Sequence, residues 1–300
     1  MSNPQAASPT IGVFDSGFGG LTVLRALIDR LPQSQFAFLG DTARLPYGSK
    51  SRRTIARYAT ESARFLVNEQ GAEFLVIACN TASALALDAI QDAVSVPVLG
   101  VIEPGAQAAG AASQSRDVLV IATDATVQSH AYAAACRAQG LRALEKACPL
   151  LVPLVEEGWT EPSSSNGKVT ASVIRIYLAE LAAEAAAHGF NPDVLVLGCT
   201  HYPLLRPLFE TAIPTGARII DSAETAAEAT AQLFGLQAGG TGNSGHPILS
   251  TPSVERVGEH PAQPTKIRCF ATDSVEKFER LGSRFLGQPV GKVQLVDLGG

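Results

Sequence analysis

Two cysteines stand at equivalent places in two similar stretches of the sequence. Residues 74–78 form a short apolar run before Cys79, and residues 194–198 form a second run before Cys199. Two polar residues follow each cysteine, and these are Asn80 and Thr81, then Thr200 and His201. The thiolate is the reactive form of cysteine, and a helix N-terminus lowers the pKa of a thiol. Each thiol is therefore a candidate base or nucleophile; the alternative is a small buried hydrophobe at the end of a strand.

The spacing of the two thiols suggests that the chain contains two related halves. They are 120 residues apart (199 − 79), which is about the length of a small α/β domain. Each half would then present a cysteine at the carboxyl end of a strand, where ligands bind in open α/β sheets. Packing alone does not explain why polar residues follow both thiols.

Polar side chains also follow other apolar runs, where strands are expected to end. They are Asp15 and Ser16, Asp41 and Thr42, Thr123 and Thr126, and Glu156 after residues 150–154. Helix capping explains some of them. Their gathering on one rim favours a small ligand with carboxylates, held by N–H groups and hydroxyls, and an ammonium group, held by an acidic side chain. The Gly-rich residues 17–20 lack the P-loop lysine and the G-x-G-x-x-G spacing, which argues against a nucleotide site.

Elements of two kinds must position these residues. Short apolar runs alternate with helical periodicity, a pattern typical of an α/β fold with parallel sheets. The predicted strands are residues 11–14, 36–39, 74–78, 96–101, 118–122, 150–154, 194–197, 218–220, 267–272 and 290–298. The predicted helices are residues 21–31, 51–69, 82–93, 129–139, 168–188, 222–234 and 275–286.

Turn signals divide the chain into two domains. Pro97 and a predicted turn at Glu103-Pro104-Gly105 mark one boundary, and residues 214–216 mark another. We expect a discontinuous first domain of residues 1–100 and 214–300, and a second domain of residues 101–213. Residues 235–264 are rich in Gly, Ser, Pro and Thr and are expected to form a loop, whose role stays open.

Composition excludes several classes of protein. The chain has 300 residues, 46% of them hydrophobic and 17% charged, which is typical of a globular protein. The formal charge of −5 leaves no basic surface for nucleic acid. No apolar run is long enough to span a membrane, and residues 1–5 lack the features of a signal peptide, so we expect a cytoplasmic protein.

The cysteine count argues against disulfides and structural zinc. The five cysteines, at positions 79, 136, 148, 199 and 269, include no C-x-x-C pair. Cys199 and His201 alone supply too few ligands to specify zinc. We expect no metal, and we expect Cys136, Cys148 and Cys269 to be inert packing residues.

Five stretches, in order, resemble the glutamate racemases of the aspartate/glutamate racemase family. They are residues 12–21, 39–48, 78–82, 100–104 and 198–204, and the resemblance extends from about residue 11 to residue 298. It implies two pseudo-symmetric α/β domains with the active site in the cleft between them. It also implies cofactor-independent interconversion of L- and D-glutamate for peptidoglycan synthesis in a bacterium, by an enzyme that is often a homodimer.

The resemblance assigns roles to individual residues. Cys79 corresponds to the base towards D-glutamate and Cys199 to the base towards L-glutamate, with Asp15 and His201 placed to assist them. Glu156 matches a family acid, although Glu157 leaves that register ambiguous. The family's substrate contacts correspond to Asp15, Ser16, Tyr47, Gly48, Asn80, Thr81, Thr200 and His201, to which the strand-end pattern adds Thr123 and Thr126. His201 and Tyr47 could also have purely structural roles. His201 would then be a hydrogen-bonded histidine at the start of a helix, and Tyr47 a packed aromatic residue.

Racemisation explains why two thiols would be needed. A proton leaves one face of Cα and another arrives on the opposite face, so a single fixed base cannot serve both. The six lysines, at positions 50, 146, 168, 266, 277 and 292, lie outside the strand-end motifs, which argues against a pyridoxal phosphate enzyme. Fixed donors such as Ser16, Asn80, Thr81 and Thr200 would then stabilise the carbanion. An aspartate racemase and a non-catalytic glutamate-binding protein remain the alternatives.

Overall fold

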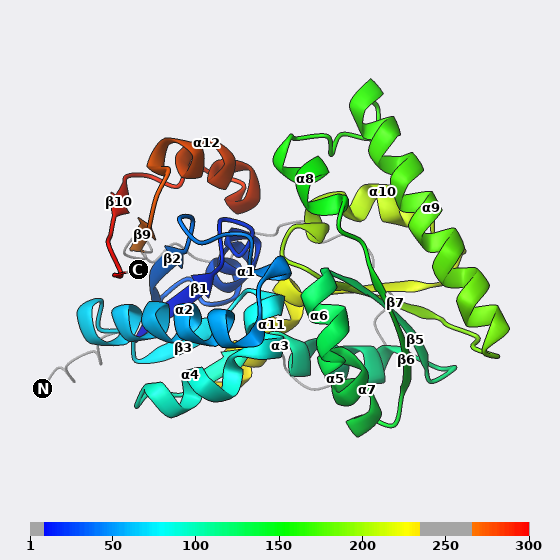
Figure 1. Cartoon of the computed structure of the whole chain (residues 1–300), viewed down its shortest axis with the longest axis horizontal. Helices are drawn as coiled ribbons and strands as arrows, with labels where there is room; N and C mark the ends of the chain where they lie inside the picture. Colours follow the sequence, from blue (N-terminus) through cyan, green and yellow to red (C-terminus); the bar gives the residue numbers. More distant parts are fainter. Residues whose placement is uncertain (1–8, 235–265, 300) are drawn as a thin grey trace, which may run out of the picture.

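The computed structural model describes residues 9–234 and 266–299, which form two parallel β-sheets with helices around them (Figure 1). One sheet has six strands in the order β10-β9-β2-β1-β3-β4, and the other has four in the order β6-β5-β7-β8. The predicted α/β fold with mainly parallel sheets is confirmed. The predicted loop at residues 235–264 and the chain start at residues 1–5 lie outside the described residues.

The six-stranded sheet is built from both ends of the chain. Its strands are β1 (Thr10–Asp15), β2 (Gln35–Gly40), β3 (Phe74–Ile77), β4 (Val98–Gly100), β9 (Ile267–Ala271) and β10 (Val293–Leu295). The accompanying helices are α1 (Leu21–Arg30), η1 (Tyr47–Ser49), α2 (Arg52–Arg64), η2 (Phe65–Glu69), α3 (Asn80–Leu85), α4 (Leu87–Ala93) and α12 (Val275–Leu286).

The four-stranded sheet comes from the middle of the chain. Its strands are β5 (Asp117–Ala122), β6 (Arg142–Ala147), β7 (Val194–Gly198) and β8 (Arg218–Asp221). The accompanying helices are α5 (Ile102–Ala112), α6 (Asp124–Ser129), α7 (Ala131–Ala138), α8 (Leu151–Glu156), α9 (Ser165–Ala187), η3 (Tyr202–Leu205), α10 (Arg206–Glu210) and α11 (Ser222–Leu233).

The central strands are continuous apolar runs because helices cover both faces of each sheet. Every residue of β3 and β7 is buried. One hydrophobic cluster joins the two halves, since it contains Val13 from β1 and Leu197 from β7. Helix α11 packs against α1 and so links the end of the second sheet to the first (Figure 1).

The predicted strand at residues 150–154 is wrong. Residues 151–156 form α8, in which Leu151 and Val155 are buried, one helical turn apart. A short apolar run fits a strand and a buried helix equally well, so periodicity did not separate them. The true strand is β6, whose residues are all exposed or half-buried at the edge of the sheet and lack the apolar signal.

The turn predicted at Glu103-Pro104-Gly105 is also wrong. These residues lie in the first turn of α5, where a proline is tolerated because its missing N–H would have no helical partner. The chain nevertheless passes from the six-stranded sheet to the four-stranded sheet between β4 and β5. It returns to the six-stranded sheet at β9. β8 lies beyond residue 213 and pairs with β7, so the four-stranded sheet continues past the expected boundary. The division into two domains stays a prediction.

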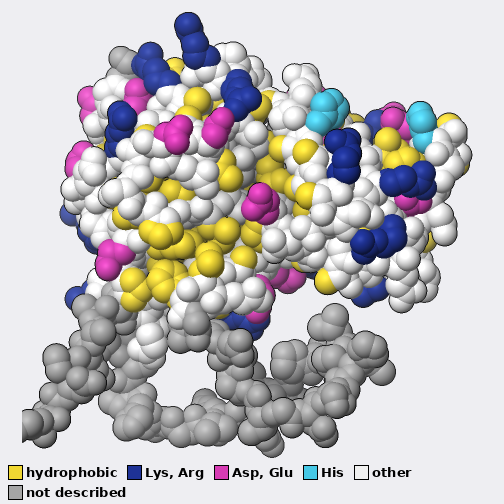
Figure 2. Space-filling view, turned by 90° about the horizontal axis from the view of Figure 1, so that it is seen from below, with side chains coloured by type: hydrophobic (Ala, Val, Ile, Leu, Met, Phe, Trp, Pro, Cys, Tyr) yellow, Lys and Arg dark blue, Asp and Glu magenta, His cyan; other side chains and the backbone are white. Residues whose placement is uncertain are grey.

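The surface shows where apolar side chains gather. Figure 2 shows hydrophobic side chains grouped on one face of the half that carries the six-stranded sheet. Among the described residues, no helix has both the length and the apolar character needed to cross a bilayer.

Candidate active site

A cavity of about 240 Å³ lies where segments from both halves of the molecule meet. Most of its wall consists of residues that follow β1, β2, β3, β5 and β7, with a further part from α8. Of the predicted site residues, it is lined by Ser16, Tyr47, Gly48, Cys79, Asn80, Thr81, Thr123, Glu156, Cys199, Thr200 and His201. Asp15 and Thr126 lie behind this wall. Among the described residues that line it, none is a lysine or arginine.

Cys79 is held at the start of α3. Its Sγ accepts a hydrogen bond from the backbone N–H of Ala82 at 3.4 Å, and its S–H donates to Oγ of Ser16 at 3.4 Å. The thiol is 5% exposed. Burial, with a smaller contribution from the negative charge of Asp15, raises the pKa of Cys79 to about 12, so this side chain is a thiol at neutral pH.

Cys199 directly follows β7 and lies beside an imidazole. Its Sγ is 3.9 Å from Nδ1 of His201, and Oγ1 of Thr200 is 3.4 Å from the same nitrogen. The two thiols thus come from different sheets and reach one cavity. The internal repeat predicted a cysteine at the end of a strand in each half, whereas a site shared by the two halves was an implication of the family resemblance.

His201 also contacts Glu156 on its other side. Nε2 of His201 lies 3.4 Å from Oε1 of Glu156. Burial disfavours the charged ring, but the contacts with Cys199 and Glu156 outweigh it and raise the pKa of His201 to about 10. The imidazole is therefore protonated at neutral pH. Glu156 lines the cavity whereas Glu157 is exposed, so the structure places Glu156 of this pair at the site.

Asp15 lies behind the cavity wall at the end of β1. Its Oδ2 accepts a hydrogen bond from the N–H of Gly17 at 2.9 Å, while Oδ1 is buried without a partner among the described residues. Burial raises the pKa of Asp15, partly offset by the charge of His201. Asp15 therefore acts on the cavity through its charge, as its effect on Cys79 shows, and does not itself border the cavity.

The absence of a side chain at Gly19 lets the loop that follows β1 lie close to the residues that follow β7. A Cβ atom at Gly19 would lie 2.4 Å from Oγ1 of Thr200 and 2.5 Å from Nδ1 of His201. Only a residue without a side chain fits there, because neither neighbour is the free end of a flexible chain. The Gly-rich stretch therefore serves close packing against His201.

Three threonine hydroxyls form a closed triangle beside Cys79. Oγ1 of Thr81 is 3.0 Å from Thr123 and 3.2 Å from Thr126, and the latter two are 3.0 Å apart. Thr126 completes the triangle from behind the wall. Asn80 next to Thr81 is fixed as well, because Oδ1 accepts from the Tyr132 hydroxyl at 2.6 Å and Nδ2 donates to Ser222 at 3.3 Å.

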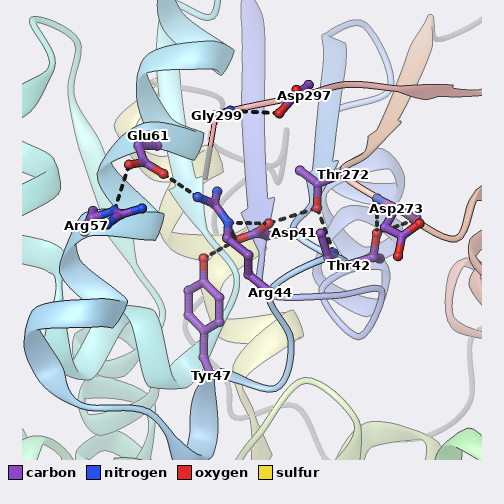
Figure 3. Close-up of polar contacts among 11 residues, drawn as sticks. Asp41, Thr42, Arg44, Tyr47, Arg57, Glu61, Thr272, Asp273, Asp297 and Gly299 are labelled. Carbon is purple, nitrogen blue, oxygen red and sulfur yellow. Dashed lines mark hydrogen bonds and ion pairs between the residues drawn. The ribbon is translucent and has the colours of Figure 1, made fainter.

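The Tyr47–Gly48 segment is tied to the first sheet through Asp41 (Figure 3). The Tyr47 hydroxyl, Nε of Arg44 and the Thr272 hydroxyl all donate to the carboxylate of Asp41, which is fully buried. Burial, followed by the charge of Asp41, raises the pKa of Tyr47 well above its usual value. The Tyr47 ring packs 6.1 Å from that of Phe14, so it is a packed aromatic that also borders the cavity.

Two residues near the site were missed at the sequence level. Both belong to α12: Nζ of Lys277 donates to Oε2 of Glu156 at 3.4 Å, and the Phe285 ring lies 5.0 Å from the His201 ring. Neither follows a strand, so the strand-end pattern contained no signal for them. Only the packing of α12 against the rest of the molecule brings them here.

The other cysteines lie apart from the cavity. Cys136, Cys148 and Cys269 are buried, and burial raises their pKa to about 11, 12 and 12 respectively. Within residues 9–234 and 266–299, no three His, Cys, Asp or Glu side chains form a group that could hold a metal ion.

Comparison with known proteins gives consistent similarity along the chain. Residues 11–230 match the family described as Asp/Glu/Hydantoin racemase. A glutamate racemase of Koribacter versatilis is 52% identical over 298 residues, which covers 97% of this chain and 98% of the relative.

Solved structures share the fold over nearly their whole length. Glutamate racemase isoform RacE1 from Bacillus anthracis matches with a TM-score of 0.79 at 33% identity, over 98% of this chain and 99% of that chain. A glutamate racemase from Francisella tularensis in complex with D-glutamate matches with a TM-score of 0.78 at 30% identity, over the same shares of the two chains.

Proposed function

The chain belongs to the Asp/Glu/Hydantoin racemase family, and on that premise we propose that it interconverts L- and D-glutamate with Cys79 and Cys199 as its two bases. The observation that carries the proposal is the presence of both thiols, from different sheets, in the wall of one cavity. Two proton carriers at one cavity are what a reaction at both faces of Cα requires.

In each direction one C–H bond and one S–H bond break, and one of each forms. One cysteine, as thiolate, forms an S–H bond with the Cα proton while the C–H electron pair stays on Cα. The S–H bond of the other cysteine then breaks, and its proton forms a new C–H bond on the opposite face. The thiol and thiolate have exchanged places, and the reverse reaction restores them. By this assignment Cys79 removes the proton of D-glutamate and Cys199 that of L-glutamate.

The two thiols have different neighbours. His201, protonated at neutral pH, lies beside Cys199 and supplies the positive charge that a thiolate there requires. Cys79 is a buried thiol hydrogen-bonded to Ser16, and its pKa of about 12 keeps it protonated at neutral pH. The substrate's ammonium group would bring a positive charge towards Asp15 and Cys79, and so would favour the thiolate of Cys79 when D-glutamate binds.

Neutral donors hold the substrate's carboxylates in this proposal. The hydroxyls of Ser16, Thr81 and Thr200 border the cavity, and Asn80 retains one of its two amide N–H groups after bonding to Ser222. Such fixed donors stabilise the charge that develops next to Cα, most strongly where water is excluded.

Glutamate is favoured over aspartate by the names of the relatives. A protein called glutamate racemase matches this chain at 52% identity over 97% of its length. A non-catalytic glutamate-binding protein would have no use for two cavity thiols, so the pair disfavours that alternative. We further propose that the D-glutamate supplies peptidoglycan synthesis in the cytoplasm, and that the protein acts as a homodimer without a cofactor.

Circular dichroism of L-glutamate incubated with the purified protein tests the proposal. We expect the ellipticity to decay to zero without added cofactor, and D-glutamate to give the mirror-image curve. In D₂O, proton NMR should show loss of the Cα proton during the decay. Constant ellipticity with no deuterium uptake from either isomer would contradict the proposal, and decay with aspartate alone would reassign the substrate.

A further inference from the structure

Lys277 forms an ion pair that crosses between the two halves of the molecule. Its Nζ lies 3.4 Å from Oε2 of Glu156. Lys277 belongs to α12, which follows β9 of the six-stranded sheet, whereas Glu156 ends α8, which follows β6 of the four-stranded sheet. Figure 1 shows α12 and α8 in these separate halves.

The Glu156 carboxylate is held at both of its oxygens. Oε2 contacts Lys277 and Oε1 contacts Nε2 of His201, whose Nδ1 lies 3.9 Å from Sγ of Cys199. A continuous row of contacts therefore joins α12 to the Cys199 thiol. The side chain of Glu156 is 22% exposed, so without Lys277 one oxygen would be free to turn towards water.

The position of Lys277 is itself supported by packing. Its Nζ lies 5.3 Å from the centre of the Phe18 ring, which borders the cavity. Phe285, two helical turns further along α12, packs against the His201 ring. The same helix thus contacts both partners of the Glu156–His201 pair.

We propose that Lys277 is a positioning residue that holds Glu156 against His201 and thereby keeps the imidazolium beside Cys199. It is not a catalytic residue, because it does not border the cavity. The Lys277 side chain is 42% exposed, so its ion pair contributes little to stability and its effect is expected on turnover. This inference rests on the proposed racemase function.

The charged groups around the pair set the direction of the pH effect. Cys199 and Asp15 face His201, and Lys277 and His201 face Glu156. Burial raises the pKa of Glu156, but His201 and Lys277 outweigh burial and lower it. Removing the lysine charge should raise the pKa of Glu156. Glu156 would then become protonated, and release His201, at a higher pH.

The test compares Lys277→Met with Lys277→Arg and with Lys292→Met, which removes the same charge from an exposed position outside the site. For Lys277→Met we expect kcat to fall roughly two- to fivefold at pH 7 with KM nearly unchanged. The acidic limb of the kcat profile should move to higher pH, so that the loss grows as pH falls. Lys277→Arg should keep kcat and the position of the acidic limb close to those of the wild type. Lys292→Met should match the wild type in both quantities.

A double-mutant comparison separates this role from a general effect on folding. In a Glu156→Gln background, Lys277→Met should cost nothing further, because the carboxylate it positions is absent. Equal profiles for Lys277→Met and Lys292→Met, or a full additional loss in the Glu156→Gln background, would overturn the inference. A wild-type protein that does not racemise glutamate would refute the proposed function instead, so the two failures are distinguishable.

Discussion

Sγ of Cys199 lies 3.9 Å from Nδ1 of His201, so one of the two cavity thiols has a protonated imidazole as its neighbour. The other thiol, Cys79, has a neutral hydroxyl and a backbone N–H as its partners. The two halves of the site thus hold chemically different surroundings for the same functional group.

Replacing either cavity cysteine should abolish racemisation. A serine hydroxyl is far less acidic than a thiol, so Cys79→Ser and Cys199→Ser should each lower kcat/KM by roughly 10²- to 10⁴-fold. The rate of racemisation is measured from the change in the ellipticity of glutamate. Cys269→Ser, which alters a buried thiol away from the cavity, is the control and should keep its activity. Full turnover by either cavity variant would refute the two-base assignment.

Glu156 and Glu157 should behave differently when each carboxylate is made neutral. Glu156→Gln removes the negative charge beside His201, which lowers the pKa of the imidazole and weakens its support of Cys199. We expect roughly a tenfold loss of kcat/KM, in line with the worth of a charge-assisted contact. Glu157→Gln, at the neighbouring exposed position, should change little. Equal losses in the two variants would contradict the assignment of Glu156.

Protonation of the His201 imidazole should stabilise the folded state at pH values below those at which the imidazole titrates. Its pKa is raised from the ordinary 6.5 to about 10, so the folded state binds this proton more tightly than the unfolded state does. The resulting contribution is complete below pH 6.5 and is lost as pH rises towards 10. Urea unfolding of the wild type and His201→Asn should show a difference that narrows between pH 6 and pH 9.5. If the difference in unfolding free energy widened over this range, the predicted direction of the pH dependence would be wrong.

Adding one methyl group at Gly19 should disturb the second half of the site. The new Cβ would lie within 2.6 Å of atoms of Thr200 and His201, so Gly19→Ala must displace the imidazole. We expect kcat/KM to fall by at least about tenfold, because small displacements of catalytic groups are costly. Gly110→Ala on α5, where the nearest atom is 3.4 Å away, serves as the control. A Gly19→Ala enzyme with wild-type kcat/KM would contradict this packing.

Removing the Tyr47 hydroxyl should destabilise the protein. Tyr47→Phe deletes one of the donors to the buried Asp41 carboxylate, which should cost about 1–3 kcal/mol of unfolding free energy. Chemical denaturation measures the loss. Tyr58→Phe makes the same change in a neighbouring, half-buried ring and should cost less. If Tyr47→Phe proved as stable as the wild type, Asp41 would not depend on this hydrogen bond.

Most of the fold could be predicted because its strands are buried on both faces. Continuous apolar runs such as β3 and β7 stand out in the sequence. β6 did not, since an edge strand of residues Arg142–Ala147 carries polar side chains. The apolar run that follows it in the sequence predicts a strand although it forms α8, because five or six residues contain too little periodicity to distinguish a strand from a helix.

The candidate site was predictable where it depends on strand ends. Parallel strands bring the residues that follow them to one edge of their sheet, which places Ser16 with Cys79 and Thr123 with Cys199. The meeting of the two edges at one cavity depends on how the halves pack, and only the family resemblance predicted it. Lys277 and Phe285 were not predictable in this way. They sit within α12, and their distance from Glu156 and His201 depends on how that helix packs on the opposite half.

The hydroxyls of Thr81, Thr123 and Thr126 are mutually within hydrogen-bond distance. In such a closed ring each hydroxyl donates once and accepts once, and the hydrogens can circulate in either of two senses. Rotating a hydroxyl hydrogen moves no heavy atom. In either sense all three hydrogens are used inside the ring, so the wall beside Cys79 presents lone pairs to an ammonium group, and it donates to a carboxylate only when one contact of the ring opens.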